Sequence, residues 1–336
     1  MTEPRFGANP PWWLGVEEEF ILVDGATLRT APAFTRLVGE PTDRLKPELF
    51  ECIVEVTTPP VENAAAALES LRGLRGEVAE RGARDGLRIH AAGTHALAQW
   101  AGQPIVPLPR YEQMVGELGK AVYRQLVCGL HVHVSVPDGE TCLHAFEGVV
   151  PWLPVLLALS ANSPFAEGEE TGLRSERASR LLEMPTGGTP PLLRTWSDWQ
   201  EAAGDGSTRR HWDAWPRPEH GTLEVRVADQ QTDVRRSAGF AALVQALVAA
   251  VAETRNEPYD RDRYRYRRAR AARAQPDPAE VEVLSVLVEP AARDLGGWEL
   301  ARQVLESGQE ADRQLALGRS DGLEAVVLDV LDRSIA

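Results

Sequence analysis

The sequence predicts an α+β protein, because two apolar periodicities occur along the chain. Short runs rich in Val, Ile and Leu alternate with period two, as in strands that bury one face. Longer Ala- and Leu-rich stretches repeat apolar residues at helical spacing instead. The 336 residues are enough for one large domain. We therefore expect a single domain over residues 1–336, with a mainly helical C-terminal part from about 256 to 336.

The expected elements follow one another in chain order. Strands are predicted at 15–23, 47–58, the start of 87–95, 128–137 and 221–230. Helices are predicted at 62–81, 110–127, 142–161, 238–252 and over most of the chain after 261. The region 163–221 is rich in Gly, Glu and Pro, so we expect it to form long loops over a site.

Composition and charge argue against several classes of function. The net charge of −14 argues against a nucleic-acid-binding surface and against an anionic membrane as partner, but it leaves small anionic ligands open. The basic run at 261–273 is interpreted as a solvated helix face or a phosphate clamp rather than a nucleic-acid site. The longest apolar stretches, 149–159 and 238–252, are shorter than the ~20 residues that span a membrane. Both are therefore expected to be core helices.

Cysteine usage favours a cytoplasmic location. The chain has three cysteines, Cys52, Cys128 and Cys142. An odd number without a C-x-x-C pair argues against a disulfide framework. No apolar signal core follows Met1, so no secretory signal is expected. A reducing cytoplasm fits both observations.

Charged residues recur on one side of four expected strands. Residues i and i+2 of a strand point to the same side, so Glu17 and Glu19 share one face while Glu18 takes the other. The same rule groups three further pairs: Glu51 with Glu55, His131 with His133, and Glu224 with Arg226. Each pair alone has an ordinary explanation, such as a solvent-facing edge, an exposed histidine pair or a cross-strand ion pair.

Taken together, the four strands predict a metal site. If they lie in one sheet, its polar face gathers several carboxylates, two imidazoles and a guanidinium. Carboxylates packed together repel one another and take up protons unless cations neutralise them. Oxygen ligands with an occasional His suit Mg²⁺ or Mn²⁺, and such sites commonly serve phosphates. Neither G-x-x-x-x-G-K-[ST] nor a G-x-G-x-x-G after a strand occurs, so we expect any ATP to be held by metals and arginines.

An ordered set of motifs resembles one known family. The pieces are GVEEEF at 15–20, ECIVEVTTPP at 51–60, AAGTHALAQW at 91–100, RYEQM at 110–114, CGLHVHVSV at 128–136, SANSPFAEG at 160–168, RSER at 174–177 and HWDAWPRPEHGTLEVRVADQQT at 211–232. In this order they resemble the type 2 glutamate–cysteine ligases, also called carboxylate–amine ligases, of the glutamine-synthetase-like superfamily. The resemblance covers roughly residues 12–255.

The resemblance implies a curved antiparallel sheet that forms an open funnel, with helices packed outside. It also implies a reaction in which ATP phosphorylates a carboxylate, typically the γ-carboxylate of glutamate. An amine then attacks the acyl phosphate to give an amide, ADP and phosphate. Mg²⁺ or Mn²⁺ ions lie between ATP and the amino acid. The implied partners are a small-molecule carboxylate and a small-molecule amine, and members of the superfamily are often homo-oligomers.

The resemblance also assigns ligands and arginines in this chain. The metal near the amino acid is assigned three glutamates: Glu19, Glu51 and Glu55. The metal that bridges ATP phosphates is assigned three ligands: Glu17, His131 and Glu224. Arg226 resembles the arginine that stabilises the transferring phosphoryl group, and Arg177 resembles a substrate- or phosphate-binding arginine.

Other residues are assigned to the substrate or nucleotide with alternatives open. His133 is either a metal ligand or a donor that orients one. Thr94 and His95 either belong to the substrate wall or simply shape a turn. Trp212 either contacts a ligand or belongs to the core, and Arg217 is a candidate ligand-binding arginine.

The chain departs from the family pattern where substrate and nucleotide contacts are expected. Trp215 stands where an arginine is usual, with Arg217 two residues away, and an aromatic ring cannot replace a phosphate-binding guanidinium. Ala96 replaces a proline, and 264–272 lacks the expected Asn and Gly. Substrates other than glutamate and cysteine are therefore open. Two alternatives also stay open: a non-catalytic relative that binds nucleotide or an amino acid, and a metal-dependent hydrolase that uses the two histidines of 128–137.

Overall fold

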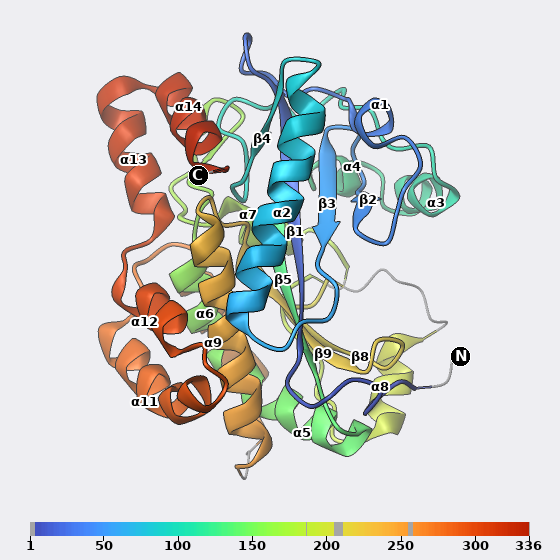
Figure 1. Ribbon diagram of the computed structural model, residues 1–336, viewed down its shortest axis with the longest axis vertical. Coiled ribbons are helices and arrows are strands. Elements are labelled where there is room, and N and C mark those ends of the chain that lie inside the picture. The colour runs from blue at the N-terminus through green and yellow to red at the C-terminus, as the bar shows by residue number, and fades with distance from the viewer. Residues whose placement is uncertain (1–3, 186, 205–210, 255–257, 336) are drawn as a thin grey trace.

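The computed structural model describes residues 4–185, 187–204, 211–254 and 258–335. At its centre lies an antiparallel sheet in the order β2-β3-β1-β5-β9-β8, with β4 also paired to β1 (Figure 1). The strands are β1 (Leu14–Asp24), β2 (Leu45–Pro47), β3 (Ile53–Thr57), β4 (Leu87–His90), β5 (Gly129–Ser135), β8 (Ala214–Arg217) and β9 (Thr222–Asp229). A separate small hairpin consists of β6 (Phe165–Ala166) and β7 (Glu169–Glu170). The described strands β2 and β8 do not pair with each other, so the sheet is open.

Helices cover one face of this sheet (Figure 1). The long helices α2 (Ala64–Ala83) and α9 (Val234–Ala252) lie side by side on it and pack against each other and against β1. The other helices up to residue 203 are α1 (Phe34–Val38), α3 (Pro109–Leu118), α4 (Lys120–Tyr123), α5 (Gly139–Val149), α6 (Leu153–Ser160), α7 (Glu176–Leu181) and α8 (Trp196–Ala203). The C-terminal helices are α10 (Arg261–Ala271), α11 (Pro278–Asp294), α12 (Trp298–Glu306), α13 (Glu310–Asp321) and α14 (Leu323–Arg333). The predicted α+β class, with an antiparallel sheet and helices outside, is confirmed.

The two most apolar helical stretches belong to the core. By length and composition, Gly139–Ser160 and Val234–Ala252 are each long enough to cross a membrane, because the helices extend beyond the apolar runs seen in the sequence. However, 78% of the apolar window of each is buried inside the protein. α9, for example, packs against β5 on one side and against α2, α5, α11 and α12 on others. The expectation that both stretches are core helices is confirmed.

The central strand β1 carries acids on both faces of the sheet. On the helix-covered face, Glu18 is fully buried and its Oε2 accepts a 2.9 Å hydrogen bond from Nε of Arg75 on α2. Arg75 also donates to the carbonyl oxygens of Thr232 (2.6 Å) and Ser334 (2.8 Å), so it ties α2 to two distant parts of the chain. Glu18 therefore belongs to the interior packing, and the predicted separation from its two neighbouring glutamates is confirmed.

The predicted second strand, 47–58, is wrong in its first half. β2 ends at Pro47 and β3 begins at Ile53, and between them the chain turns, with Ile53 N donating to Phe50 O over 2.9 Å. Glu51 lies in this turn, so the period-two rule that placed it beside Glu55 does not apply to it. The apolar residues continue through the turn, which hides the break from the sequence pattern.

The described part of the region 163–221 is also more ordered than its polar composition predicts, because it contains α7, α8 and β8.

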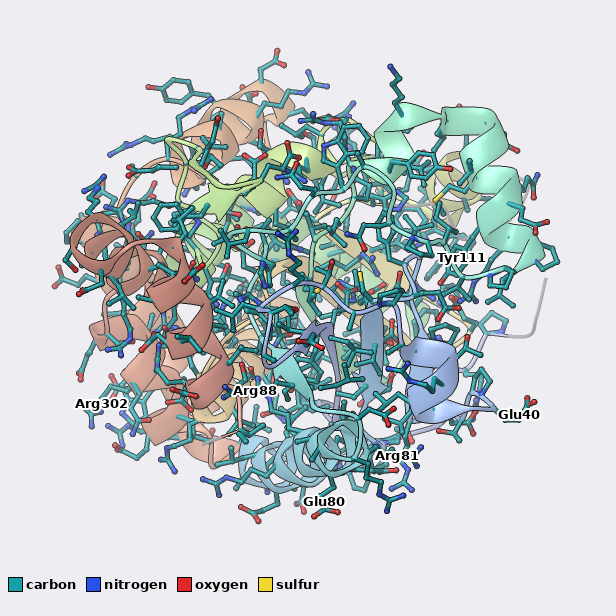
Figure 2. All side chains as sticks on the ribbon, turned by 90° about the horizontal axis from the view of Figure 1, so that it is seen from above. Glu40, Glu80, Arg81, Arg88, Tyr111 and Arg302 are labelled. Carbon is teal, nitrogen blue, oxygen red and sulfur yellow. The ribbon has the colours of Figure 1, made fainter. Side chains whose placement is uncertain are left out.

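Charged side chains elsewhere cover the outside of the molecule (Figure 2). Glu40 and Glu80, for example, are exposed at the surface, whereas Tyr111 on α3 is buried. The helix α3 therefore turns its aromatic residue inward, towards the region where the candidate site lies.

Candidate active site

The sheet face opposite α2 and α9 gathers the predicted charged residues. Residues directly opposite each other in adjacent antiparallel strands point to the same side. The register pairs Glu19 with Glu55, Glu17 with His131, and His133 with Glu224. Side chains from β1, β3, β5 and β9 are thereby brought together, and the expectation that the four strands lie in one sheet is confirmed.

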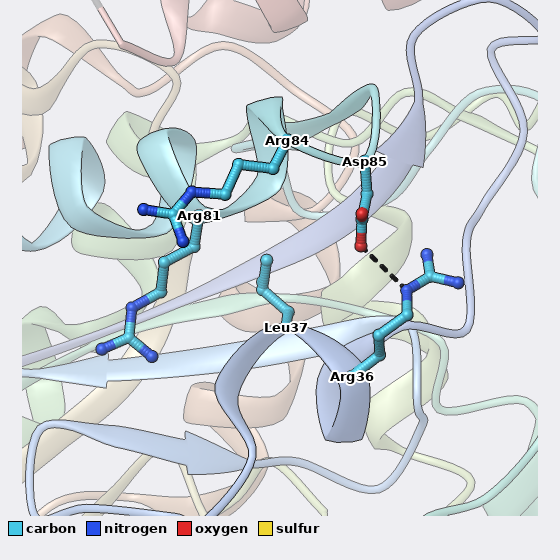
Figure 3. A pocket seen from close by; sticks show the side chains of 5 residues that line it. All are labelled: Arg36, Leu37, Arg81, Arg84 and Asp85. Atoms are coloured by element: carbon cyan, nitrogen blue, oxygen red, sulfur yellow. Dashed lines mark ion pairs between the residues drawn. The ribbon is translucent and has the colours of Figure 1, made fainter.

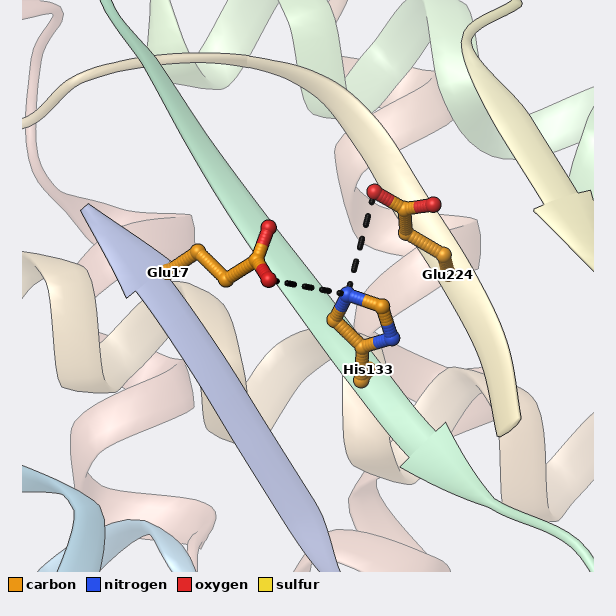
Figure 4. Close-up of side chains that lie close together, drawn as sticks. All are labelled: Glu17, His133 and Glu224. Carbon is orange, nitrogen blue, oxygen red and sulfur yellow. Dashed lines mark ion pairs between the residues drawn. The ribbon is translucent and has the colours of Figure 1, made fainter. Parts of the chain in front are cut away.

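Glu17, His133 and Glu224 form a group that we name the histidine cluster (Figure 4). The Nε2 atom of His133 lies 3.7 Å from Glu17 Oε1 and 3.7 Å from Glu224 Oε1. Its Nδ1 atom lies 3.0 Å from the hydroxyl of Thr222, which holds the ring in place. Nε2 itself is buried without a hydrogen-bond partner among the described residues. Three ligand atoms within 4.8 Å of one another, one of them unsatisfied, fit a divalent cation.

Glu19, Glu48 and Glu55 form a second group, the glutamate cluster, whose ligand atoms also lie within 4.8 Å of one another. Lys46 Nζ approaches it to 3.2 Å from Glu55 Oε1. Burial, and then the charges of Glu19 and Glu55, raise the pKa of Glu48 well above its usual value. Burial and the charge of Glu17 raise the pKa of Glu55 as well. A bound Mg²⁺ or Mn²⁺ would relieve this crowding of acids, so the cluster fits a divalent cation.

His131 lies between the two clusters. Its Nδ1 atom is 3.2 Å from Glu17 Oε2 and 4.0 Å from Glu224 Oε1, and its Nε2 atom is 3.8 Å from Glu19 Oε1. Burial works to raise the pKa of Glu17, but His131 and His133 outweigh burial and lower that pKa well below its usual value. The two clusters therefore differ: histidines keep Glu17 ionised, whereas Glu48 and Glu55 of the glutamate cluster retain protons more readily.

Glu51 belongs to neither cluster, which corrects its assignment as a ligand beside Glu19 and Glu55. Its Oε2 accepts a 3.1 Å hydrogen bond from Thr35 N, and its Oε1 accepts a 2.8 Å bond from Thr35 Oγ1. These bonds satisfy the first turn of α1, so Glu51 acts as a helix cap. Glu48 lies beside Glu19 and Glu55 instead, and the sequence analysis did not identify it. Its position could have been inferred, because Glu48 directly follows the edge strand β2, which pairs with the strand β3 that carries Glu55.

Two arginines hold Glu224. Nη1 of Arg226 donates to Glu224 Oε1, and Nη1 of Arg217 donates to Glu224 Oε2 over 2.9 Å. Burial works to raise the pKa of Glu224, but the two guanidinium charges outweigh burial and lower that pKa well below its usual value. Arg217 therefore reaches the site from β8. Trp215, which replaces the expected arginine, is buried instead and stacks on Trp199 with ring centroids 5.5 Å apart.

A pocket adjoins the glutamate cluster, and both polar and apolar residues line it. The polar residues are Glu19, Glu48, Gln125, His131, Arg177, His211 and Arg226, and the apolar or aromatic residues are Leu49, Ile53, Tyr111, Met114, Val127, Leu181 and Met184. Arg177 on α7 donates to the carbonyl oxygens of Arg226 (3.0 Å) and Val227 (3.3 Å). Its Nε is buried without a hydrogen-bond partner among the described residues. A buried guanidinium with an unused donor in a pocket wall can bind an oxyanion.

The remaining predicted contacts do not line this pocket. Thr94 Oγ1 donates to Phe165 O over 2.6 Å, and His95 packs on His90 with ring centroids 4.6 Å apart. Burial lowers the pKa of His95 to about 4, so its ring is neutral. Trp212 packs against Trp215, with ring centroids 4.6 Å apart. The structure thus places these residues in packed surroundings rather than beside the ligand clusters.

Another hollow lies at the C-terminal end of α2, away from the clusters (Figure 3). It is lined by Arg36, Leu37, Arg81, Arg84 and Asp85, and Arg36 pairs with Asp85 over 2.9 Å. Arginines at the C-terminal end of a helix interact favourably with its dipole. We therefore interpret this hollow as a surface feature.

Solved structures share this fold. The glutamate–cysteine ligase of Francisella tularensis in complex with AMP has a TM-score of 0.71 and 14% identity, with 96% of this chain and 88% of that chain covered. A bifunctional glutathione synthetase from Pasteurella multocida has a TM-score of 0.64 and 15% identity, with 96% and 51% covered. At such low identity these likenesses show the fold alone.

Sequence relatives show the family. A protein of Rubrobacter xylanophilus with the provisional name glutamate–cysteine ligase 2-3 is 36% identical over 364 residues, which cover 99% of this chain and 100% of the relative. Residues 13–326 match the family model described as glutamate-cysteine ligase family 2. The family resemblance drawn from the motifs is confirmed, and this chain belongs to glutamate-cysteine ligase family 2.

Proposed function

We propose that this protein is an ATP-dependent carboxylate–amine ligase that forms an amide through an acyl phosphate, with ADP and phosphate as the other products. The observation that carries the proposal is the pair of ligand clusters on one sheet face, with a pocket beside them whose wall contains Arg177 and Arg226. Family membership supports the ligase class. The AMP bound by the Francisella tularensis neighbour supports a nucleotide site in this fold.

The two clusters are the places we assign to divalent cations, Mg²⁺ or Mn²⁺. Such ions, when bound, neutralise phosphate oxygens and so lower the barrier to phosphoryl transfer. The histidine cluster offers two carboxylates and one imidazole, and the glutamate cluster offers three carboxylates. Oxygen-rich sets of this kind suit Mg²⁺ and Mn²⁺ better than Zn²⁺, which favours the ligase over a hydrolase.

The reaction has two balanced steps. First, an oxygen of the substrate carboxylate attacks the γ-phosphorus of ATP, and ADP leaves. Then the amine nitrogen attacks the acyl carbon, phosphate leaves, and the nitrogen loses a proton. We assign Arg226 to the oxygens of the transferring phosphoryl group, because Glu224 holds its guanidinium and that group is always charged. We assign Arg177 to a carboxylate or phosphate of the substrates, because its Nε retains an unused N–H.

For the acid we propose glutamate, or a similar amino acid, that reacts at its γ-carboxylate. The amine is a small molecule, and the apolar residues Ile53, Met114 and Met184 in the pocket lining fit an uncharged side chain on one substrate. A cytoplasmic location is part of the proposal, since Cys52, Cys128 and Cys142 are all free thiols.

The test measures ADP release with Mg²⁺ and ATP, first with single amino acids and then with pairs of an acid and an amine. Release that requires both would establish a ligase and name its substrates. Release with the acid alone would show that the acyl phosphate forms and is hydrolysed. If no pair releases ADP although nucleotide binds, the protein is a non-catalytic relative and the proposal fails. Product formation without ATP would favour the hydrolase instead.

A further inference from the structure

One arginine of the basic run at 261–273 points inward, which neither a solvated face nor a phosphate clamp explains. Arg268 on α10 is buried, and its Nε and Nη2 donate to the two carboxylate oxygens of Asp213 over 2.5 and 3.1 Å. Tyr264, about one helical turn earlier, donates its hydroxyl to Asp213 Oδ2 over 2.5 Å. A buried ion pair with bidentate geometry allows one arrangement of its partners.

These three side chains are joined to both arginines of the pocket wall. Nη1 of Arg268 donates over 2.9 Å to the carbonyl oxygen of Ala178, the residue after Arg177 in the first turn of α7. On the other side, the carbonyl oxygen of Asp213 accepts a 2.9 Å hydrogen bond from the backbone nitrogen of Arg226. Arg268 and Asp213 thus connect the helix that carries one pocket arginine to the strand that carries the other.

Among the residues that the structure describes, no carboxylate forms an ion pair with Arg177. The hydrogen bonds of its guanidinium that the structure shows go to backbone carbonyl oxygens of Arg226 and Val227 on β9. Its position in the pocket is therefore set by how α7 sits on β9. Arg268 contributes to that relation, since its guanidinium donates both to α7 and to Asp213, whose carbonyl oxygen accepts a hydrogen bond from β9. The N-cap of α7, Ser175, contributes as well, because its hydroxyl donates to Asp229 Oδ1 of β9 over 2.8 Å.

We propose that Asp213, Tyr264 and Arg268, which we name the hub, are positioning residues that set the places of Arg177 and Arg226. The inference rests on the proposed function, in which these two arginines contact the substrates. The hub residues do not line the pocket, so they act through the arginines rather than on the substrates. Family membership does not assign this role, which follows from the contacts alone.

The first test is Arg268→Lys, which keeps the charge but loses the planar fork that holds Asp213 and Ala178 together. We expect a folded protein whose kcat for ADP release falls about ten- to a hundredfold, with KM for ATP changed less than about twofold. The matched control is Arg270→Lys on the same helix, an exposed residue whose ion pair with Asp277 is 3.5 Å long, and it should leave kcat unchanged. A folded Arg268→Lys protein with wild-type kcat would overturn the proposal.

If Arg268→Lys does not fold, Tyr264→Phe provides the test, because it removes a single hydrogen bond to Asp213 and no charge. We expect its melting temperature to fall by only a few degrees, as for one lost hydrogen bond, while kcat falls about fivefold. An unchanged kcat in this folded variant would also overturn the hub.

A second readout separates failure of the hub from failure of the proposed function. Phenylglyoxal modifies accessible guanidinium groups, and peptide mass spectrometry follows each arginine. In Arg268→Lys we expect Arg177 and Arg226 to react faster, whereas Arg36 and Arg84 of the exposed hollow (Figure 3) react at the wild-type rate. If the wild type releases no ADP with any substrate, the ligase proposal fails. The labelling rates still test whether the hub positions Arg177 and Arg226, because they do not depend on activity. Unchanged labelling of both pocket arginines in a folded variant would overturn the hub.

Discussion

Three consecutive glutamates of β1 lie in two environments that differ in how their charges are balanced. Glu18 faces the helices, where Arg75, Gln230 and Ser237 all donate hydrogen bonds to its carboxylate. On the opposite face, the glutamate cluster brings three acids together with Lys46 as the nearest basic group. The charge of Glu18 is thus balanced by its ion pair with Arg75, whereas three acids of the glutamate cluster crowd together beside Lys46.

This contrast separates an acid that builds the fold from acids that we propose to bind a cation. Burial does not make the distinction, since Glu18 and Glu19 are both buried. What differs is the balance of donors and charge around each carboxylate. A buried acid with a full set of donors stabilises packing, whereas crowding and burial raise the pKa values of Glu48 and Glu55, and a cation from outside the chain would offset that crowding.

The largest effect is expected on the helix-covered face. Glu18→Gln leaves the Arg75 guanidinium buried without its carboxylate, and breaking a buried pair in this way typically costs about 3–5 kcal/mol. We therefore expect the free energy of unfolding in urea to fall by that amount, with kcat per folded molecule retained. A loss of less than about 1 kcal/mol, the size for an exposed pair, would contradict the structural role.

The next effect is expected on the opposite face and concerns turnover. Glu19→Gln and Glu48→Gln each remove a carboxylate from the glutamate cluster, so ADP release should fall about 100- to 1,000-fold, as when one charge-stabilising group is lost. Stability without metal should be equal or higher, because repulsion is relieved.

Glu51→Gln is the matched control for these two variants. Glu51→Gln weakens the hydrogen bonds that the Glu51 carboxylate accepts from Thr35 in the first turn of α1. It should therefore lower the free energy of unfolding by about 1 kcal/mol and leave turnover intact. If Glu51→Gln abolished turnover while Glu48→Gln spared it, the ligand assignment made from sequence would stand and the one made from geometry would fall.

The exchange of Glu51 for Glu48 shows what the sequence pattern can and cannot predict. Period two was enough to separate Glu18 from its neighbours and to place the paired acids and histidines on one face. It failed at Glu51, because a turn without a break in hydrophobicity changes the side on which a residue lies. The hub could not be predicted either, since a run of arginines gives no sign that Arg268 is buried against Asp213.

A smaller effect is expected for the arginines that accompany the clusters. Arg226→Lys keeps the charge beside Glu224 but loses the planar fork, so kcat should fall about ten- to a hundredfold while substrate binding changes little. Arg217→Lys should have a weaker effect, because Arg217 lies on the edge strand β8 and does not line the pocket, whereas Arg226 does. Equal kcat values for wild type and Arg226→Lys would remove Arg226 from the mechanism.

The smallest effect is the pH dependence of stability without metal. Folding raises the pKa of Glu48 and Glu55 above the usual value of 4.5, so the folded state binds protons that the unfolded chain releases. Stability from these groups is therefore lost as pH rises from about 4.5 through the raised values. Glu17 behaves in the opposite way, because folding lowers its pKa. Its contribution to stability is present above about pH 4.5 and is lost as the pH falls below that value towards the lowered pKa.

Magnesium should compensate for this loss, because it binds the ionised carboxylates of the glutamate cluster. We expect the rise in melting temperature caused by Mg²⁺, relative to EDTA, to be larger at pH 8 than at pH 5. Glu48→Gln should flatten this difference, whereas Glu51→Gln should preserve it, since only Glu48 belongs to the cluster. A magnesium effect that is independent of pH in the wild type would mean that the crowded acids are not the ligands. The contrast between the two faces of β1 would then rest on Glu18 alone.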